Sequence, residues 1–210
     1  MHPPGAIVFL LDHGGRKTIE DMDTGFSHLD DASLIRKIQQ GSHEAFATMV
    51  NRHTSRFYRI AYRLVFNKND AEDMVQEAFL RLWERPQLWN PSRQAKFTTW
   101  FYKVVINLCL DLNKKKRPLP LPEDMELLDR HPGQDVLLGI HQEQALLEGF
   151  IKRLPARQQL ALNLTFYEGL SNQEAADIIG IKVKALQSLI MRAKTTLKEK
   201  VKRYLPGGSI

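Results

Sequence analysis

The sequence predicts an all-α fold of two small helical domains joined by an acidic, proline-rich linker, the second of them a helix-turn-helix domain. Apolar residues recur at helical spacing through most of the 210 residues, and no stretch shows a convincing strand period of two. Residues 118–140 break this pattern with four prolines, two glycines and five acids against one arginine. A helix pair with recognisable capping residues follows between Leu170 and Val201.

These observations divide the chain into four parts. We expect a flexible extension over residues 1–30, a first domain over 31–117, a linker over 118–140 and a second domain over 141–205. The extension has no sustained period, and Met22 is a hypothetical true start because organised sequence begins shortly after it. Each domain is small enough that its core is modest and that a partner can contribute to its order.

The first domain opens with two helices. A short one begins at Asp31, and after a break at Gly41-Ser42 a longer one continues to Phe66. A polar turn over residues 67–70 follows, in which Asn69 or Asp70 can cap the next helix.

The next helix, from Ala71 to Trp83, combines a core stripe with an acidic outer face. The core stripe consists of Ala71, Met74, Val75, Ala78, Phe79, Leu82 and Trp83. The opposite face carries Asp73, Gln76, Glu77 and Leu80. An apolar leucine among acids, directed away from the core, indicates a docking surface for a basic partner. The alternative is an amphipathic helix whose outer face is simply solvated.

A long helix over residues 97–117 combines aromatic and basic residues. We expect an inner stripe of Phe97, Phe101, Val104 or Val105, and Leu108. The candidate nucleic-acid-binding residues lie off that stripe or in the basic run at its end: Trp100, Tyr102, Lys103, Asn107, Lys114 and Lys115. Bases stack on rings, an amide recognises an exposed base edge and cations hold the backbone, so this pattern fits single-stranded or melted nucleic acid. The alternative is that the aromatic residues belong to the core.

The segment from Leu170 to Val201 predicts a helix-turn-helix. Ser171 and Glu174 form a capping box, and Gly180 ends the first helix where a left-handed backbone costs least. We expect Ala175, Ala176 and Ile179 on its inner face, followed by a second-helix stripe of Leu186, Ile190, Ala193 and Leu197. The outward residues include Lys184, Gln187, Ser188, Arg192 and Lys194, which are donors suited to phosphates and base edges. The alternative is a helical hairpin that only packs.

The charges of the chain favour a polyanionic partner. The formal net charge is +6, and the segment from Arg85 to Arg117 holds eight basic residues and one acid. We identify no catalytic constellation, cofactor fingerprint or Cys/His cluster at metal spacing, and therefore predict a protein that is not an enzyme and needs no cofactor or metal. The single cysteine, Cys109, is expected to be buried, and the apolar run at 7–11 is too short for a membrane span. The cytoplasm is the consistent compartment.

With these motifs in order, the chain resembles bacterial sigma factors of the extracytoplasmic-function (ECF) group, which retain only the second and fourth conserved regions. The polymerase-docking sub-region of that family is similar to DAEDMVQEAFLRLW (70–83). The sub-regions that melt and recognise the minus-ten element are similar to FTTWFYKVVINLCLDLNKKKR (97–117). The start of the fourth region, with its helix-turn-helix, is similar to LPARQQLALNLTFYEGLSNQEAADIIGI (154–181).

The resemblance implies a transcription initiation factor that binds core RNA polymerase, through the beta-prime clamp helices and the beta flap, and promoter DNA. Core polymerase would be contacted by Asp73, Gln76, Glu77 and Leu80. The melted minus-ten strand would be held by Trp100, Tyr102 and Lys103, and Asn107 with the 90–96 loop would receive a flipped base. The minus-thirty-five duplex would face Ser171, Lys184, Gln187, Ser188 and Arg192. The family also implies an anti-sigma factor as a partner.

Two features limit the match, and two other functions compete with it. After Val183 many members carry Gly-Thr-Val-Lys-Ser-Arg, whereas this chain has Lys184-Ala185-Leu186-Gln187-Ser188-Leu189. Sequence preference should therefore differ from the common one, or depend more on backbone contacts and DNA shape. The extension has no counterpart in the family. One competing function is a helix-turn-helix repressor or activator that acts without polymerase, which leaves the 70–83 helix and the aromatic-basic helix unexplained. The other is an RNA-binding or RNA-processing protein that uses the same basic helix; as an enzyme it would need a catalytic carboxylate or histidine constellation, and the sequence shows none.

Overall fold

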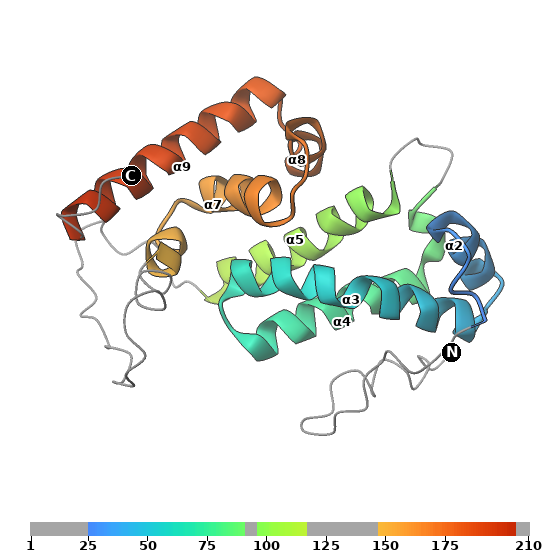
Figure 1. Cartoon of the computed structure of the whole chain (residues 1–210). Helices are drawn as coiled ribbons and strands as arrows, with labels where there is room; N and C mark the ends of the chain where they lie inside the picture. Colours follow the sequence, from blue (N-terminus) through green and yellow to red (C-terminus); the bar gives the residue numbers. More distant parts are fainter. Residues whose placement is uncertain (1–24, 91–95, 117–146, 205–210) are drawn as a thin grey trace. The chain divides into compact units, whose positions relative to one another are not determined.

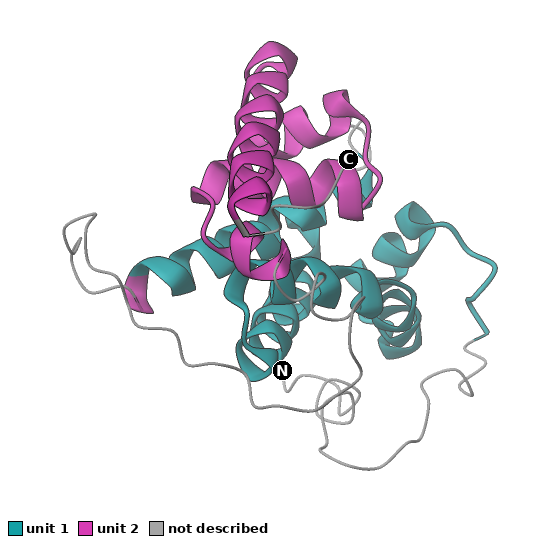
Figure 2. Cartoon of the chain, turned by 60° about the vertical axis from the view of Figure 1, so that its left-hand side comes forward, with its two compact units in different colours: residues 1–114 teal, residues 115–210 magenta. Residues whose placement is uncertain are grey.

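The computed structural model describes residues 25–90, 96–116 and 147–204 (Figure 1). Within these ranges the secondary structure is helical and contains no strand, in agreement with the predicted class. The chain forms two compact units that meet in sequence between Lys114 and Lys115 (Figure 2). Met22 and the predicted linker lie outside the described residues.

Unit 1 consists of α2 (Asp31–Gln39), α3 (His43–Val65), α4 (Lys68–Glu84), the 3-10 turn η2 (Pro86–Leu88) and α5 (Phe97–Lys116), of which the last two residues fall beyond the boundary between the units. Side chains cap the first three helices, since Asp30, Ser42 and Asn67 each accept a hydrogen bond from a backbone N–H three residues later. The prediction of Asn69 or Asp70 as the cap of α4 is wrong. Asn67 is the last residue with an extended backbone, so it holds the capping position instead.

Aromatic rings fill the space between α3, α4 and α5. Phe57 of α3 lies with its ring centroid 4.6 Å from that of Phe101 and 4.9 Å from that of Tyr102, both on α5. Phe79 of α4 lies 4.8 Å from Phe101, measured the same way. These rings are almost completely buried, and edge-to-face packing of this kind adds to the free energy of burial. The core therefore fixes α5 against two helices at once.

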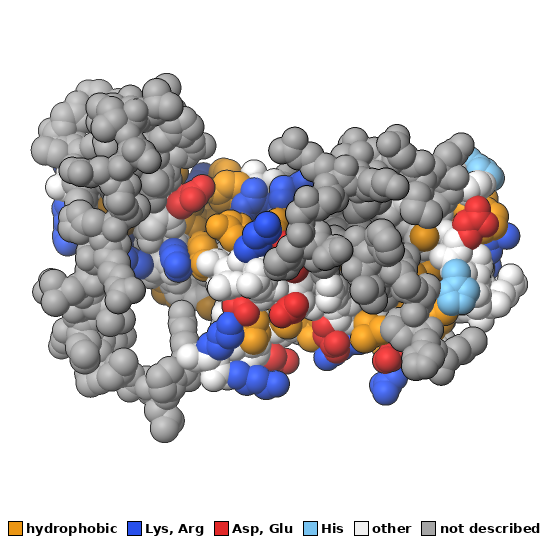
Figure 3. All heavy atoms as spheres, turned by 90° about the horizontal axis from the view of Figure 1, so that it is seen from below, with side chains coloured by type: hydrophobic (Ala, Val, Ile, Leu, Met, Phe, Trp, Pro, Cys, Tyr) orange, Lys and Arg blue, Asp and Glu red, His pale blue; other side chains and the backbone are white. Residues whose placement is uncertain are grey.

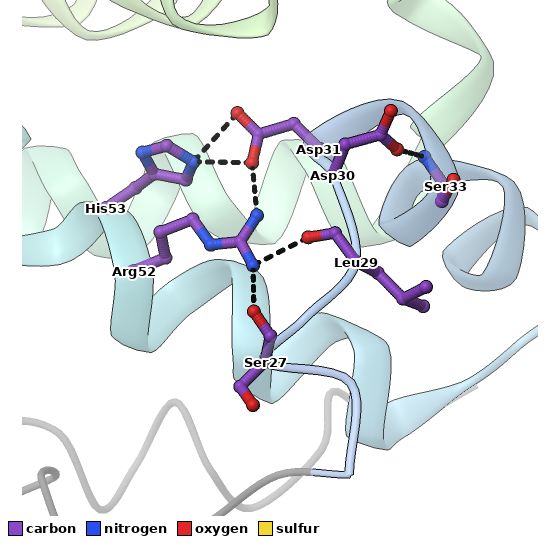
Figure 4. A network of polar contacts seen from close by, with 7 residues as sticks. All are labelled: Ser27, Leu29, Asp30, Asp31, Ser33, Arg52 and His53. Carbon is purple, nitrogen blue, oxygen red and sulfur yellow. Dashed lines mark hydrogen bonds and ion pairs between the residues drawn. The ribbon is translucent and has the colours of Figure 1, made fainter.

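A polar network holds the chain just before α2 against α3 (Figure 4). Arg52 donates to the carboxylate of Asp31 at 2.8 Å and to the carbonyl oxygens of Ser27 and Leu29 at 2.9 and 2.7 Å. Both oxygens of Asp31 also lie 3.1 Å from Nε2 of His53, which is buried. Residues 25–28 accordingly form a turn, which corrects the prediction that flexibility extends to residue 30.

The charge state of Asp31 is part of this network. Burial raises the pKa of the Asp31 carboxyl, but the hydrogen bonds and positive charges of His53 and Arg52 outweigh burial and leave the pKa below its usual value. The ionised form is thus the one that the folded structure stabilises.

Unit 2 consists of a helical segment at 147–152, α7 (Ala156–Leu162), the π-helical turn η4 (Asn163–Tyr167), α8 (Asn172–Ile179) and α9 (Val183–Tyr204). Its core includes a cluster of Leu154, Leu162 and Ala193, with Ile190 and Leu197 packed at the edge. The predicted stripe of α9 is confirmed, since Leu186 and Ala193 are completely buried and the other two residues are half-buried.

Candidate nucleic-acid and protein interfaces

The outer face of α4 carries the predicted docking residues. Asp73 is exposed, and Gln76, Glu77 and Leu80 are half-buried. Glu77 accepts a hydrogen bond from Nε of Arg81 at 2.8 Å, one helical turn away. The predicted core stripe is buried except for Met74, which is half-exposed at the edge. The face thus offers carboxylates around one partly exposed leucine.

The outer face of α4 is not distinguished from the rest of the surface by net charge alone. Seen from below, acidic, basic and apolar side chains are interspersed over the visible surface, with no single large patch of one sign (Figure 3). The predicted docking face is therefore distinguished by the particular residues of α4 and not by a broad patch of one charge in this view.

The exposed side of α5 forms one continuous stripe. Trp100, Lys103, Asn107 and Lys114 follow one another at spacings of three, four and seven residues, which places them on the same side of a helix. Lys103, Asn107, Lys114 and Lys115 are exposed, and Trp100 is half-buried. Nζ of Lys114 lies 3.1 Å from a carboxylate oxygen of Asp111 in an exposed pair that contributes little to stability.

Tyr102 does not belong to this stripe. Its side chain is 1% exposed, and its ring packs edge-on against Phe57. The prediction that Tyr102 lies off the inner stripe is wrong, because α5 packs against α3 as well as α4 and buries a wider arc than one stripe. In this conformation its ring cannot stack on a base.

The two ends of the 90–96 loop are anchored in the core. Trp89 and Phe97 are 5% and 2% exposed, and their rings meet edge-to-face at 5.8 Å between centroids. The ring of His53 lies 5.3 Å from that of Phe97, so the network around Asp31 also reaches the start of α5. Residues 91–95 themselves lie outside the described residues. Trp89 and His53 were not among the predicted site residues: Trp89 follows the short turn η2 and His53 lies in the middle of α3, and neither position carries a local sequence signal.

The helix-turn-helix has the predicted caps. Oγ of Ser171 accepts from the N–H of Glu174 at 3.2 Å, and the N–H of Ser171 donates to Oε2 of Glu174 at 3.1 Å. Gly180 has a left-handed backbone with φ of 76°. One detail differs, since Ile178 is buried and the predicted Ile179 is half-buried.

The outward residues of α9 are exposed as predicted: Lys184, Gln187, Ser188, Arg192 and Lys194. Two candidate DNA contacts already have intramolecular partners. The hydroxyl of Ser188 donates to the carbonyl of Lys184 at 3.0 Å, and Ser171 is engaged in the capping box. Within the described residues, the side-chain cations of Lys184 and Arg192 have no intramolecular hydrogen bond or ion pair, so contacts with the DNA backbone are the simplest use of this face.

An open groove of about 730 Å³ lies between η4, the start of α8 and α9. Phe166 and Met191 are 56% and 64% exposed on its rim. Nζ of Lys194 lies 4.7 Å from the ring centroid of Phe166. The groove has no signature in the sequence, because the apolar residues that form it come from segments distant in sequence.

No group of three metal-ligating side chains occurs within the described ranges. No helix in those ranges is long and apolar enough to cross a membrane. Cys109 is completely buried, and burial raises the pKa of its thiol to about 12, so the thiol stays protonated and unreactive near neutral pH.

Comparisons with known proteins identify the family of the chain. Models of sigma-70 region 2 and sigma-70 region 4 match residues 49–118 and 144–197. The chain is 32% identical over 174 residues to the ECF RNA polymerase sigma factor SigE of Mycolicibacterium smegmatis. It is 28% identical over 180 residues to the ECF RNA polymerase sigma factor SigW of Bacillus subtilis. The chain belongs to the ECF sigma factors.

This ECF sigma factor spans its relatives to different extents. The alignments cover 79% of the chain and 65% of SigE, and 80% of the chain and 95% of SigW. The match to region 2 begins within α3 and takes in α4 and α5, and the match to region 4 takes in α7, α8 and most of α9.

Solved structures share the fold of this sigma factor. CnrH in complex with the cytosolic domain of CnrY matches with a TM-score of 0.62 at 23% identity, covering 82% of this chain and 97% of that one. The sigma factor RpoE in complex with the anti-sigma factor NepR from Bartonella quintana matches with a TM-score of 0.56 at 20% identity, covering 75% and 96%. At these identities the likeness concerns the fold alone.

Proposed function

We propose that this sigma factor binds core RNA polymerase, directs it to specific promoters and melts the minus-ten element. The observation that carries the proposal is the combination, in one chain, of an acidic and partly apolar face on α4 with two separate basic surfaces on α5 and α9. A factor that only binds duplex DNA has no use for the first of these. The protein performs no covalent chemistry in this scheme, acts in the cytoplasm and needs no cofactor.

In this proposal the docking face is formed by Asp73, Gln76, Glu77 and Leu80, which contact the beta-prime clamp helices. The carboxylates steer a basic partner and Leu80 supplies apolar area at the centre. Reversing both charges, Asp73→Lys with Glu77→Lys, should weaken binding to core polymerase at least tenfold while thermal unfolding of unit 1 changes little. A matched control makes the same change in net charge within the linker, Glu123→Lys with Asp124→Lys. Equal core affinity in both variants would reject this face as the docking site.

The exposed stripe of α5 is proposed to hold the melted minus-ten strand. Trp100 offers part of its ring for stacking, Asn107 recognises a flipped base, and Lys103, Lys114 and Lys115 hold phosphates. Tyr102 takes no direct part, because it is buried. Stacking and phosphate contacts made only with the open strand convert binding energy into strand separation.

The outward residues of the second unit are proposed to contact the minus-thirty-five duplex: Ser171, Lys184, Gln187, Ser188 and Arg192. The two hydroxyls have intramolecular partners, so the main contribution is expected from the cations, through phosphates, and from the amide of Gln187 at a base edge. Sequence preference at this element should therefore be weak and should depend on DNA shape.

The groove beside Phe166 and Met191 is the proposed contact for the beta flap. Two exposed apolar side chains on a concave surface fit an amphipathic helix, and the lysines at the rim fit acidic residues on it. We also propose regulation by an anti-sigma factor, which is supported by the solved complex of RpoE with such a partner.

The experiment that tests the whole proposal combines purified protein with core polymerase and genomic DNA fragments. Co-elution with core polymerase and transcripts that start at specific sites would support it, and the mapped starts would give the promoter sequence. Binding to DNA fragments without polymerase would favour the repressor function instead, for which the comparisons give no support.

A further inference from the structure

Four arginines form a row along α3. Arg52, Arg56, Arg59 and Arg63 follow one another at spacings of four, three and four, which places them on one side of the helix. Arg52 is committed to Asp31 and to two backbone carbonyls. Arg56 and Arg59 are exposed and, within the part of the chain that the structure describes, pair with no acidic side chain. Two guanidinium groups on this row are thus available to an external partner.

The helix that carries this row, α3, packs beside α5. Three contacts between α3 and α5 follow the same order along both helices. His53 contacts Phe97, Phe57 contacts Tyr102, and the carbonyl oxygen of Leu64 accepts a hydrogen bond from Asn113 at 2.9 Å. α3 and α5 are therefore parallel neighbours, as Figure 1 shows.

The geometry of two parallel helices then brings their cations to one side. Phe57 and Tyr102 point toward each other across the interface of α3 and α5. Arg56 comes one residue before Phe57, and Lys103 comes one residue after Tyr102. Because the two helices run in the same direction, these opposite shifts along the chain turn both side chains toward the same side of the helix pair. Both residues are exposed, so this side is the solvent-facing one. Arg56 and Lys103 consequently lie on the same solvent-facing side of the α3–α5 pair.

An aromatic ring accompanies the arginines. Tyr62 is 45% exposed, one turn from Arg59 on the outer part of α3. Its ring is held nearly parallel to that of Tyr58, at 20° and 6.2 Å between centroids, which limits its rotamers before any ligand binds. A supported ring beside unpaired guanidinium groups is a surface on which a base can stack while its phosphates are held.

We propose that Arg56, Arg59 and Tyr62 form a second contact surface, on the solvent-facing side of α3, for the single strand of melted promoter DNA, in addition to the α5 stripe. The inference rests on the proposed function. A basic partner protein fits the acidic face of α4, whereas this row has the opposite sign and fits a polyanion. The exposed ring favours an unstacked strand over a duplex, in which the bases are not available for stacking on a side chain.

The test measures how the affinity of holoenzyme for a promoter probe with a single-stranded non-template overhang depends on salt. Each phosphate contact to a single strand contributes about 0.7 to the slope of log K against log salt concentration. The variant Arg56→Ala with Arg59→Ala should therefore reduce the slope by about 1.4. The matched control, Arg56→Lys with Arg59→Lys, keeps the charges and should keep the slope. Tyr62→Ala should weaken binding about fivefold or more with an unchanged slope, since a stacked base carries no charge.

Several outcomes would overturn the inference. An unchanged slope in the alanine variant, with holoenzyme otherwise active, would show that no phosphate is held there. Weakened binding to core polymerase without a change in slope would assign the row to the polymerase. Failure of wild-type protein to bind core polymerase would instead reject the proposed function itself, so the two failures are distinguishable.

Discussion

Asn163 is a costly residue in the core of unit 2, and replacing it should stabilise the unit. The residue is 1% exposed at the junction of α7 and η4, and neither Oδ1 nor Nδ2 has a hydrogen-bond partner among the residues that the structure describes. A buried polar group without a partner costs about 1–3 kcal/mol. Asn163→Leu removes both polar groups and adds apolar contacts. Imperfect packing of the leucine side chain is expected to reduce the gain in stability by up to about 1.5 kcal/mol.

The net gain is therefore expected to be about 2 kcal/mol. For a unit of this size each kcal/mol raises Tm by about 4–8 °C, so Asn163→Leu should raise the Tm of unit 2 by about 8–16 °C. Asn163→Asp has nearly the same shape but buries a charge, and it should lower the Tm.

The chain offers an internal way to separate the two units in the assay. All three tryptophans, Trp83, Trp89 and Trp100, lie in unit 1. Tryptophan fluorescence consequently follows unit 1 alone, whereas far-ultraviolet circular dichroism follows both units. The expected result is a higher transition by circular dichroism with an unchanged fluorescence transition. A Tm for Asn163→Leu at or below that of the wild type would refute the argument, because it would mean that the amide contributes favourably where it is.

Three other predictions follow from the same structure. Gly180→Ala should destabilise unit 2 by about 1–2 kcal/mol, seen in the same thermal scans, because its φ of 76° is strained for any residue with a Cβ. Tyr102→Ala should destabilise unit 1 by about 3–5 kcal/mol, whereas Trp100→Ala should fold normally and lose promoter opening in a permanganate assay; the reverse pattern would contradict the burial of Tyr102. Asp31→Asn should lower stability at pH 7, and denaturant titrations should show that difference begin to shrink near pH 3.8 and disappear as the pH falls through the lower pKa of Asp31 in the folded state. The folded pKa of Asp31 is depressed, so its contribution is present above the unfolded value and is lost on protonation; a pH-independent gap would contradict it.

The features that the sequence predicted well are those that depend on neighbours within one or two helical turns. Ser171, Glu174 and Gly180 form the predicted capping box and helix end, because a cap needs only a side chain and the adjacent backbone. The exposed positions of α9 follow from a helical period against a single packing face, and these were also predicted correctly.

Tyr102 shows where prediction from helical period failed. The prediction of one buried stripe assumes that a helix packs against a single neighbour. However, α5 packs against two helices: Tyr102 contacts Phe57 of α3, and Phe101 contacts Phe79 of α4. The second contact buries residues about 100° from the first stripe, including Ile106 and Cys109. No local pattern distinguishes a tyrosine on that second face from one in solvent.

The sequence by itself determined the helical class, the order of the motifs, the helix-turn-helix caps and the family resemblance, because each depends on local spacing. Only the tertiary structure decided which aromatic rings are available to DNA, which arginines of α3 remain unpaired, and that Phe166 and Met191 border one groove. Those properties depend on which helices become neighbours, and that is set by packing between residues far apart in the chain.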